Sequence, residues 1–288
     1  MVGAISLASG AVLDVAMAPW SGKGTGEHAL LREILTVFKP GDIVLGDAYY
    51  SSFFLIALLI GMGVDVVFAA HGSRGKDFRR GVRLGKGDHR VQWKKPARPK
   101  WMSQEEYQDF PKFIEVRESR MVLQSKGQRS KTMVVVSTLK DAKTVAVANL
   151  SELYGYRWFI EVDFRSIKSI MHMEILRCKT PTRVRKEIWA HLLAYNLVRK
   201  EMVQAAIQHR RRPRDMSFKL ALQMMGAFLQ AGVLSSKNTK AYSRFQWAII
   251  SKKIGLQKRL SEPRRVKRRP KPFPLLQKPR HLYRKELV

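Results

Sequence analysis

The sequence predicts an α/β protein with a β-rich basic insertion and a helical C-terminal part. Three observations predict it. Strand and helix patterns alternate over residues 1–70, alternating strands and clustered cations fill residues 71–149, and helical patterns occupy residues 150–256. Residues 257–288 contain twelve Lys or Arg, two Glu and five Pro, which is typical of a basic disordered tail.

The chain carries a strong positive charge. Its 288 residues include 54 Lys or Arg and 23 Asp or Glu, a formal net charge of +31. Such an excess favours a polyanionic partner, with nucleic acid first and an acidic membrane surface second. Cys178 is the single cysteine. This excludes an internal disulfide and a cysteine-based zinc site, and it is typical of a reducing, cytoplasmic compartment.

The first seventy residues are expected to begin with a hairpin, formed by residues 2–9 and 11–17 around a turn at Gly10. A glycine-rich loop, residues 21–26, then opens a helix. That loop lacks the Lys-Ser/Thr ending of a phosphate-binding loop, so a flexible helix entry is the favoured interpretation. The apolar face of the helix consists of five side chains: Leu30, Leu31, Ile34, Leu35 and Phe38.

A short apolar strand, residues 43–45, follows the helix and ends at Gly46 and Asp47. The next apolar run, residues 53–68, is broken by glycines and by Asp65. It therefore stops short of the roughly 20 residues that cross a bilayer. We expect a buried helix, a turn and a second strand, and no membrane segment.

The basic segment that follows has eleven Lys or Arg and two Asp within residues 74–100. Two of its aromatic side chains, Trp93 and Trp101, would stack on unpaired bases or pack within a small β-subdomain, and both interpretations stay open. Strand patterns recur at residues 113–117 and 133–138. Three histidines lack zinc spacing and are expected to be packed or at the surface: His28, His172 and His191.

The segment from Leu153 to Lys168 carries the most information. With about 100° between successive residues of a helix, one narrow stripe holds Tyr154, Arg157, Glu161 and Lys168. The adjacent, core-packed face would hold Leu153, Ile160, Phe164 and Ile167. A carboxylate flanked by cations suits a hard metal ion beside phosphate. The alternative is an ordinary solvated amphipathic helix.

The order Tyr, two residues, Arg, three residues, Glu, six residues, Lys resembles the signature of the DDE-type insertion-sequence transposases. Three further segments are similar to that family: residues 41–47, 136–141 and 193–199. The resemblance extends over roughly residues 2–205.

This resemblance implies an RNase H-like catalytic domain in which three carboxylates bind two Mg²⁺ ions and DNA strands are cleaved and transferred. Asp47, at the end of a strand, matches the family's second acid, and Glu161 matches the third. Tyr154, Arg157 and Lys168 match residues that would contact the DNA backbone. The implied partner is double-stranded DNA, at transposon ends and target, with a homodimer in a synaptic complex and association with the nucleoid.

The family's first acid lies on a strand upstream of the hairpin, and no residue of this sequence occupies that position. Asp14 and Asp42 lie in later segments, so neither is assigned to the site. The chain is thus expected to begin inside the domain, as an N-terminally truncated transposase. An alternative is an inactive remnant that only binds DNA, and a third, weaker one is a basic RNA-associated structural protein.

Overall fold

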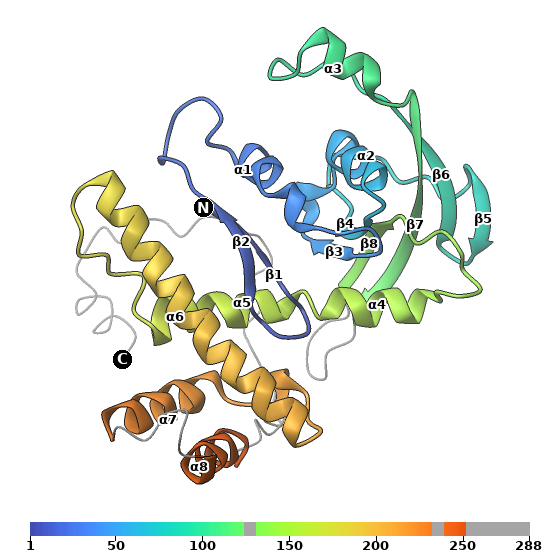
Figure 1. Cartoon of the computed structure of the whole chain (residues 1–288). Helices are drawn as coiled ribbons and strands as arrows, with labels where there is room; N and C mark the ends of the chain where they lie inside the picture. Colours follow the sequence, from blue (N-terminus) through green and yellow to red (C-terminus); the bar gives the residue numbers. More distant parts are fainter. Residues whose placement is uncertain (124–130, 232–238, 252–288) are drawn as a thin grey trace, which may run out of the picture.

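A computed structural model describes residues 1–123, 131–231 and 239–251 (Figure 1). The expected disordered tail, residues 257–288, lies outside the described residues. The first seventy residues form these elements: β1 (Val2–Ile5), β2 (Val12–Ala16), α1 (Glu27–Glu33), η1 (Leu35–Val37), β3 (Ile43–Gly46), η2 (Ala48–Tyr50), α2 (Phe53–Gly61) and β4 (Asp65–Ala69). The expected hairpin and both expected strands are present.

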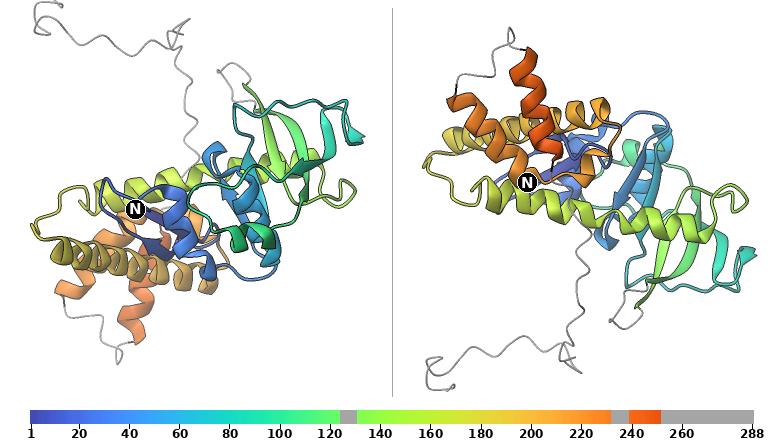
Figure 2. Two further views of the ribbon diagram at one scale, coloured as in Figure 1. Left: turned by 90° about the horizontal axis from the view of Figure 1, so that it is seen from above. Right: turned by 90° about the horizontal axis from the view of Figure 1, so that it is seen from below.

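The second half of the described chain begins with four strands and ends in helices. Its elements are β5 (Val82–Gly85), β6 (Asp88–Lys94), α3 (Gln104–Asp109), β7 (Phe113–Leu123), β8 (Lys131–Ser137), α4 (Val147–Gly155), α5 (Trp158–Arg165), η3 (Ser166–Ile170), α6 (Pro181–Gln208), η4 (Pro213–Asp215), α7 (Phe218–Gln230) and α8 (Thr239–Ile250). Helices α6, α7 and α8 gather at one end of the molecule, and strands β5 to β8 lie at the other (Figure 2).

The strands form two sheets. β1 and β2 make an antiparallel hairpin, and the other six lie in the order β3-β4-β8-β7-β6-β5. β3 and β4 are parallel, whereas β4 and β8 are antiparallel, with Val67 opposite Ser137. Strands β5 to β8 lie within residues 71–149 and continue the sheet that β3 and β4 begin. That this segment is an insertion stays a prediction. The fold is therefore α/β with a mixed sheet.

Three apolar clusters hold these layers together. The first joins β1, α1 and α2 to one face of the sheet, and the third packs α4 against Val67, Met121 and Val135 on strands of that sheet. The second lies among α6, α7, α8 and the hairpin. The hairpin contributes Val2 to the first cluster and Val15 to the second, so it joins two cores.

The two edges of the hairpin have different neighbours. On the β2 edge, the side-chain amide of Asn196 in α6 makes two hydrogen bonds to the backbone of Val12. Its Oδ1 accepts from the Val12 N–H at 2.9 Å and its Nδ2 donates to the Val12 carbonyl at 2.8 Å. β1 pairs only with β2 among the described strands. Its other edge borders a pocket.

The single helix expected over residues 153–168 is wrong in detail. α4 ends at Gly155, α5 begins at Trp158, and the π-helix η3 follows. Across the junction the backbone stays right-handed, but Arg157 N–H bonds to the Tyr154 carbonyl, three residues back. Such a tight turn advances about 120° per residue instead of 100°. The expected stripe, which places Tyr154 and Lys168 with Glu161, rests on a uniform helical count that does not hold across this segment.

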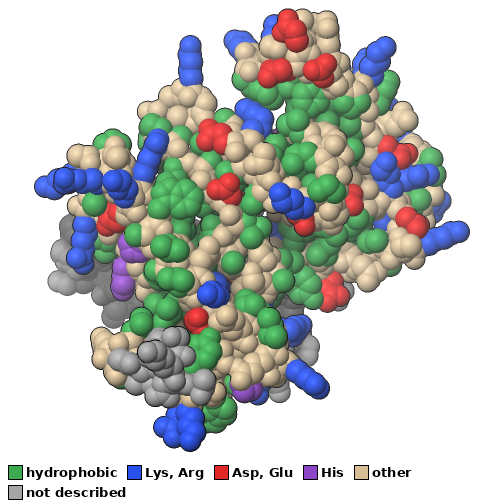
Figure 3. Space-filling model, viewed as in Figure 1, with side chains coloured by type: hydrophobic (Ala, Val, Ile, Leu, Met, Phe, Trp, Pro, Cys, Tyr) green, Lys and Arg blue, Asp and Glu red, His purple; other side chains and the backbone are tan. Residues whose placement is uncertain are grey.

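No helix in the described ranges is long and apolar enough to cross a membrane. On the face shown in Figure 3, Lys and Arg side chains stand out around the outline of the molecule.

Candidate active site

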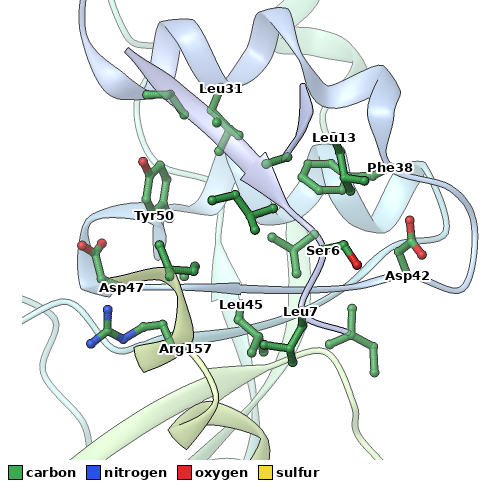
Figure 4. Close-up of a pocket in the computed structure, with 18 of the residues that line it drawn as sticks. Ser6, Leu7, Leu13, Leu31, Phe38, Asp42, Leu45, Asp47, Tyr50 and Arg157 are labelled. Carbon is green, nitrogen blue, oxygen red and sulfur yellow. The ribbon is translucent and has the colours of Figure 1, made fainter. Parts of the chain in front are cut away.

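A cavity of about 640 Å³ separates the hairpin from the six-stranded sheet (Figure 4). Residues of β1 form one wall, and residues of β3 form another. Three residues of α5 also line it: Ile160, Glu161 and Phe164. The cavity thus lies where two strand edges and the expected signature helix meet.

Asp47 lies at the carboxyl end of β3. Its extended backbone lets the side chain cap η2, with Oδ1 accepting from the Tyr49 N–H at 2.8 Å. Asp42 precedes the strand and accepts from the Lys39 N–H at 2.8 Å. Asp42 and Asp47 flank β3, and five residue steps of extended chain span about 16 Å. The two carboxylates therefore lie at opposite ends of the pocket, as Figure 4 shows.

Glu161 and Arg157 lie one turn apart at the start of α5. Arg157 Nη2 is 3.0 Å from Glu161 Oε1, and the Glu161 side chain is 53% exposed. Exposed pairs at this helical spacing contribute only about 0.3–0.5 kcal/mol. The Glu161 carboxylate can therefore exchange Arg157 for another cation at little cost.

Tyr154 is a core residue, only 7% exposed, that packs with Leu150 and Val67 behind the pocket. Burial raises the pKa of its hydroxyl, the positive charge of Arg157 opposes the rise, and the negative charge of Asp47 adds to it. The Arg157 guanidinium carbon lies 5.9 Å from the centre of the Tyr154 ring. Tyr154 is therefore a buried neighbour of Arg157.

Lys168 lies outside this group. It is exposed on η3, with Nζ 5.7 Å from the centre of the Phe164 ring, and it does not line the cavity. Of the five residues expected at the site, the cavity walls thus bring together Asp47, Arg157 and Glu161.

The end of the pocket near Asp47 also contains Glu27 and Tyr50. The Tyr50 hydroxyl donates to Glu27 Oε2 at 3.3 Å. Burial raises the pKa of Tyr50, and the charges of Glu27 and Asp47 raise it further. This end of the cavity is therefore acidic, which favours a cation there.

Two residues that line or support the pocket were missed in the sequence. Arg214, from η4, lines the cavity, and the fully buried Asp163 of α5 holds it, with Arg214 Nη1 2.6 Å from Asp163 Oδ1. Their separation of 51 positions gives no local pattern. The only signal was Asp163 itself, a carboxylate about 200° around the helix from Glu161.

The other candidates are placed as follows. Trp93 is buried and donates from Nε1 to Glu118 Oε1 at 2.9 Å, so it packs within the sheet region. Trp101 is half exposed, with the Arg32 guanidinium 3.8 Å from its ring centre. Asp14 accepts from the Val15 N–H and does not line the cavity.

Carboxylate oxygens are the ligands that Mg²⁺ prefers in proteins, and Asp47 and Glu161 supply two of them to one cavity. Within the described ranges, no group of three or more His, Cys, Asp or Glu side chains is placed to hold a metal ion. These residues therefore fit part of a metal site, and a further ligand is needed to complete it.

Comparison with known proteins gives a family match over most of this architecture. A family model described as "Transposase DDE domain" matches residues 1–197. The transposase InsG for insertion sequence element IS4 of Escherichia coli strain K12 is 30% identical over 184 residues, covering 62% of this chain and 39% of that protein. The transposase for insertion sequence element IS421 of Escherichia coli is 31% identical over 91 residues, covering 28% of this chain and 24% of that protein.

The chain thus spans well under half the length of these curated relatives. The matched region contains β1 to α5, and hence all of the cavity walls described above except Arg214. Because the family model covers more than half of the chain, the chain belongs to the family of DDE-domain transposases.

Proposed function

We propose that this chain forms the catalytic part of a DNA transposase that cleaves DNA strands and transfers them to a target. The observation that carries the proposal is the meeting of Asp47, Arg157 and Glu161 at one cavity, inside the segment that matches the transposase family. In an RNase H-like arrangement, a carboxylate at the end of a central strand would lie beside one on a helix. The positions of Asp47 and Glu161 support that arrangement.

Asp47 and Glu161 would hold Mg²⁺ at the acidic end of the pocket. When bound, a pair of such ions activates water and then a 3′-hydroxyl for attack on a phosphodiester and stabilises the leaving oxygen. Arg157, freed from Glu161, would hold a phosphate oxygen of the DNA backbone. Lys168 would contact the backbone farther along, as a mobile positive charge.

The missing ligand has a candidate location in the cavity itself. β1 and β3 both turn an unpaired edge toward it, and Ile43 of β3 is 44% exposed. An exposed apolar edge strand favours pairing with a further strand. We propose that an extended segment upstream of β1 occupies this cavity, pairs with both edges, and brings the family's first carboxylate next to Asp47.

The test compares two proteins. In the strand-completed protein, an apolar strand of roughly six residues with one Asp is joined to Met1 through a short turn. Its matched control carries Asn in place of that added Asp. Incubation with a labelled duplex and Mg²⁺ or Mn²⁺ should give strand cleavage by the strand-completed protein only. The 288-residue chain alone should not cleave.

Substitutions in the strand-completed protein then test each ligand. Glu161→Gln and Asp47→Asn should each lower cleavage more than about a hundredfold, because even residues that only support a metal ligand cost 10–100-fold. Asp42→Asn, at the opposite end of the same pocket, should leave cleavage within a factor of about two of the parent. Full activity after Glu161→Gln would contradict the assignment of that carboxylate.

A second function, DNA binding without cleavage, is favoured by one observation: among the described residues, no group of three or more His, Cys, Asp or Glu side chains is placed to hold a metal ion. With a net charge of +31, affinity for duplex DNA should fall steeply with salt, by about 0.9 in log–log slope for each neutralised phosphate. A strand-completed protein that binds DNA with this salt dependence but never cleaves would favour this second function.

The basic tail gives a separate prediction. Deletion of residues 257–288 should weaken binding to all DNA sequences alike and reduce the salt slope, because backbone contacts carry no sequence information. The measurement is a salt titration by fluorescence anisotropy. An unchanged slope would show that the tail makes no contact with DNA.

A further inference from the structure

Asp163 is the centre of a buried cluster next to the candidate site. Its side chain is fully buried, and its Oδ1 accepts from Arg199 Nη2 at 2.6 Å and from Arg214 Nη1 at 2.6 Å. The Tyr195 hydroxyl is 3.1 Å from the same oxygen. Oδ2 accepts from Arg214 Nη1 at 2.9 Å. One carboxylate thus accepts hydrogen bonds from two guanidinium groups and a phenol hydroxyl.

The same cluster holds the turn of the hairpin. Arg214 donates from Nε to the Leu7 carbonyl at 2.8 Å and from Nη2 to the Ser6 carbonyl at 3.0 Å. The Tyr195 hydroxyl donates to the Gly10 carbonyl at 2.8 Å. Gly10 has φ +80°, and a Cβ there would lie 2.8 Å from Arg199 Cζ. The turn therefore approaches the guanidinium groups more closely than a side chain would allow.

The rotation of α5 about its own axis depends on contacts outside the helix, such as those of Asp163. The helix has eight residues and lies between a tight turn and a π-helix. Neither neighbour continues a regular α-helical hydrogen-bond ladder. The rotation of α5 about its own axis is therefore not fixed by a longer helix of which it is part. Asp163 and Glu161 are two residues apart, which places their side chains about 200° apart around the axis. If Asp163 points into the buried cluster, Glu161 must point away from it, toward the cavity.

We propose that Asp163, held by Arg199 and Arg214, is a positioning residue that sets the rotation of α5 and thereby directs Glu161 into the pocket. The same contacts set the spacing between α5 and the turn that follows β1, because Arg214 bonds both to Asp163 and to the Ser6 and Leu7 carbonyls. The role of Glu161 itself rests on the proposed function. The rotation of α5 does not, so the two can fail separately.

A second buried pair in the same chain offers a matched control. Asp88 of β6 accepts from Arg117 Nε at 2.9 Å, from Arg117 Nη2 at 2.8 Å and from the Ser119 hydroxyl at 2.7 Å. Both Asp88 and Arg117 are buried, and neither lines the cavity. Loss of one partner from either cluster removes a buried ionic contact, but only the Asp163 cluster touches α5.

The experiment measures a distance between spin labels in the full chain. Labels are attached at Ile43→Cys and Glu161→Cys, on two walls of the pocket, in a Cys178→Ser background. The distance distribution is compared among the otherwise unchanged protein, Asp163→Asn, Tyr195→Phe and Asp88→Asn. Asparagine keeps the shape of the aspartate and removes its charge, and phenylalanine removes only the hydroxyl contacts to Asp163, Arg199 and Gly10.

We expect Asp163→Asn to shift and broaden the distribution, Tyr195→Phe to broaden it less, and Asp88→Asn to leave it unchanged. If Asp163→Asn does not fold, Tyr195→Phe decides: broadening supports the proposal and an unchanged distribution overturns it. Equal broadening in Asp88→Asn would also overturn it, because general loosening would then be the cause. If the strand-completed protein cleaves DNA, Asp163→Asn should in addition lower its cleavage rate while DNA affinity stays unchanged.

Discussion

The two ends of the six-stranded sheet differ in how their outer strands meet their surroundings. β5, at one end, carries Arg83, shifts register against β6, and starts directly after Gly81. β3, at the other end, consists of three apolar residues and a glycine, pairs in even register with β4, and faces the cavity. Charge and irregular register protect an edge from further pairing, whereas a regular apolar edge invites it.

This difference fits the strand proposed above, which would extend the sheet at β3 and not at β5. Neighbouring strands illustrate it. β4 is buried along its centre, with Val66, Val67 and Phe68 at most 1% exposed, whereas Ile43 on β3 remains 44% exposed. The candidate carboxylates lie at the open end. The candidate site and the position proposed for a further strand therefore coincide.

The largest expected effect concerns the glycines that precede the two end strands, Gly81 before β5 and Gly41 before β3. Gly81 has φ +77°, and a Cβ there would overlap the carbonyl oxygen of Arg90. Gly41 has φ +90° with nothing within 4 Å. Gly81→Ala should therefore destabilise the chain by at least about 3 kcal/mol, from backbone strain plus overlap. Gly41→Ala should cost about 1–2 kcal/mol, from strain alone.

Urea unfolding followed by circular dichroism measures both variants. Equal losses in the free energy of unfolding would show that the chain at the β5 end is no more closely packed than at the β3 end. That result would contradict the difference drawn between the two ends.

A smaller effect tests whether β3 becomes an interior strand. In the strand-completed protein, Ile43→Lys should cost about 2 kcal/mol, because the added strand covers a side chain that is 44% exposed without it. Val82→Lys, on β5 and 52% exposed, should change stability by less than about 0.5 kcal/mol. In the 288-residue chain, each of the two substitutions should change stability by less than about 0.5 kcal/mol. The urea midpoints of these four variants and of their two parents give the answer. An unchanged cost of Ile43→Lys after completion would argue against a strand in the cavity.

The smallest effect tests the charge at the open end. The Asp47 carboxylate disfavours the anionic form of Tyr154 and so raises its pKa, in addition to burial. Asp47→Asn should therefore lower the pKa of Tyr154, and its tyrosinate should appear at lower pH. Carbon-13 NMR of labelled tyrosine rings follows the titration. Tyr242, whose pKa is raised by burial and by Glu201, serves as an internal control and should not move.

The local pattern of the sequence predicted the first half of the fold well. Gly10 between two apolar runs indicated the hairpin, and the apolar residues before Asp47 indicated β3, because both signals depend on neighbours in the chain. The helix expected to reach Phe38 ends at Glu33, and the 3-10 helix η1 takes its place over Leu35–Val37. Helix ends depend on tertiary packing and are poorly specified by periodicity.

The candidate site was predictable where the family signature covered it. Asp47, Arg157 and Glu161 were placed on that basis, and they line one cavity. Tyr154 was expected at the surface stripe but is buried, because the turn after Gly155 changes the angular count. Asp163 and its arginines were out of reach, since a buried ion pair between distant positions leaves no periodic trace in the sequence.

The paired amide of Asn196 decides the direction in which the hairpin can grow. Because that side chain already satisfies the N–H and carbonyl of Val12, a foreign strand approaching β2 would find those groups engaged and a helix in its way. Only the β1 side can accept another strand. A hairpin that can pair with a further strand on one edge only cannot take part in continuous edge-to-edge sheet growth, which needs two free edges. The same asymmetry that leaves room for one partner strand therefore guards the chain against stacking into fibrils through its hairpin.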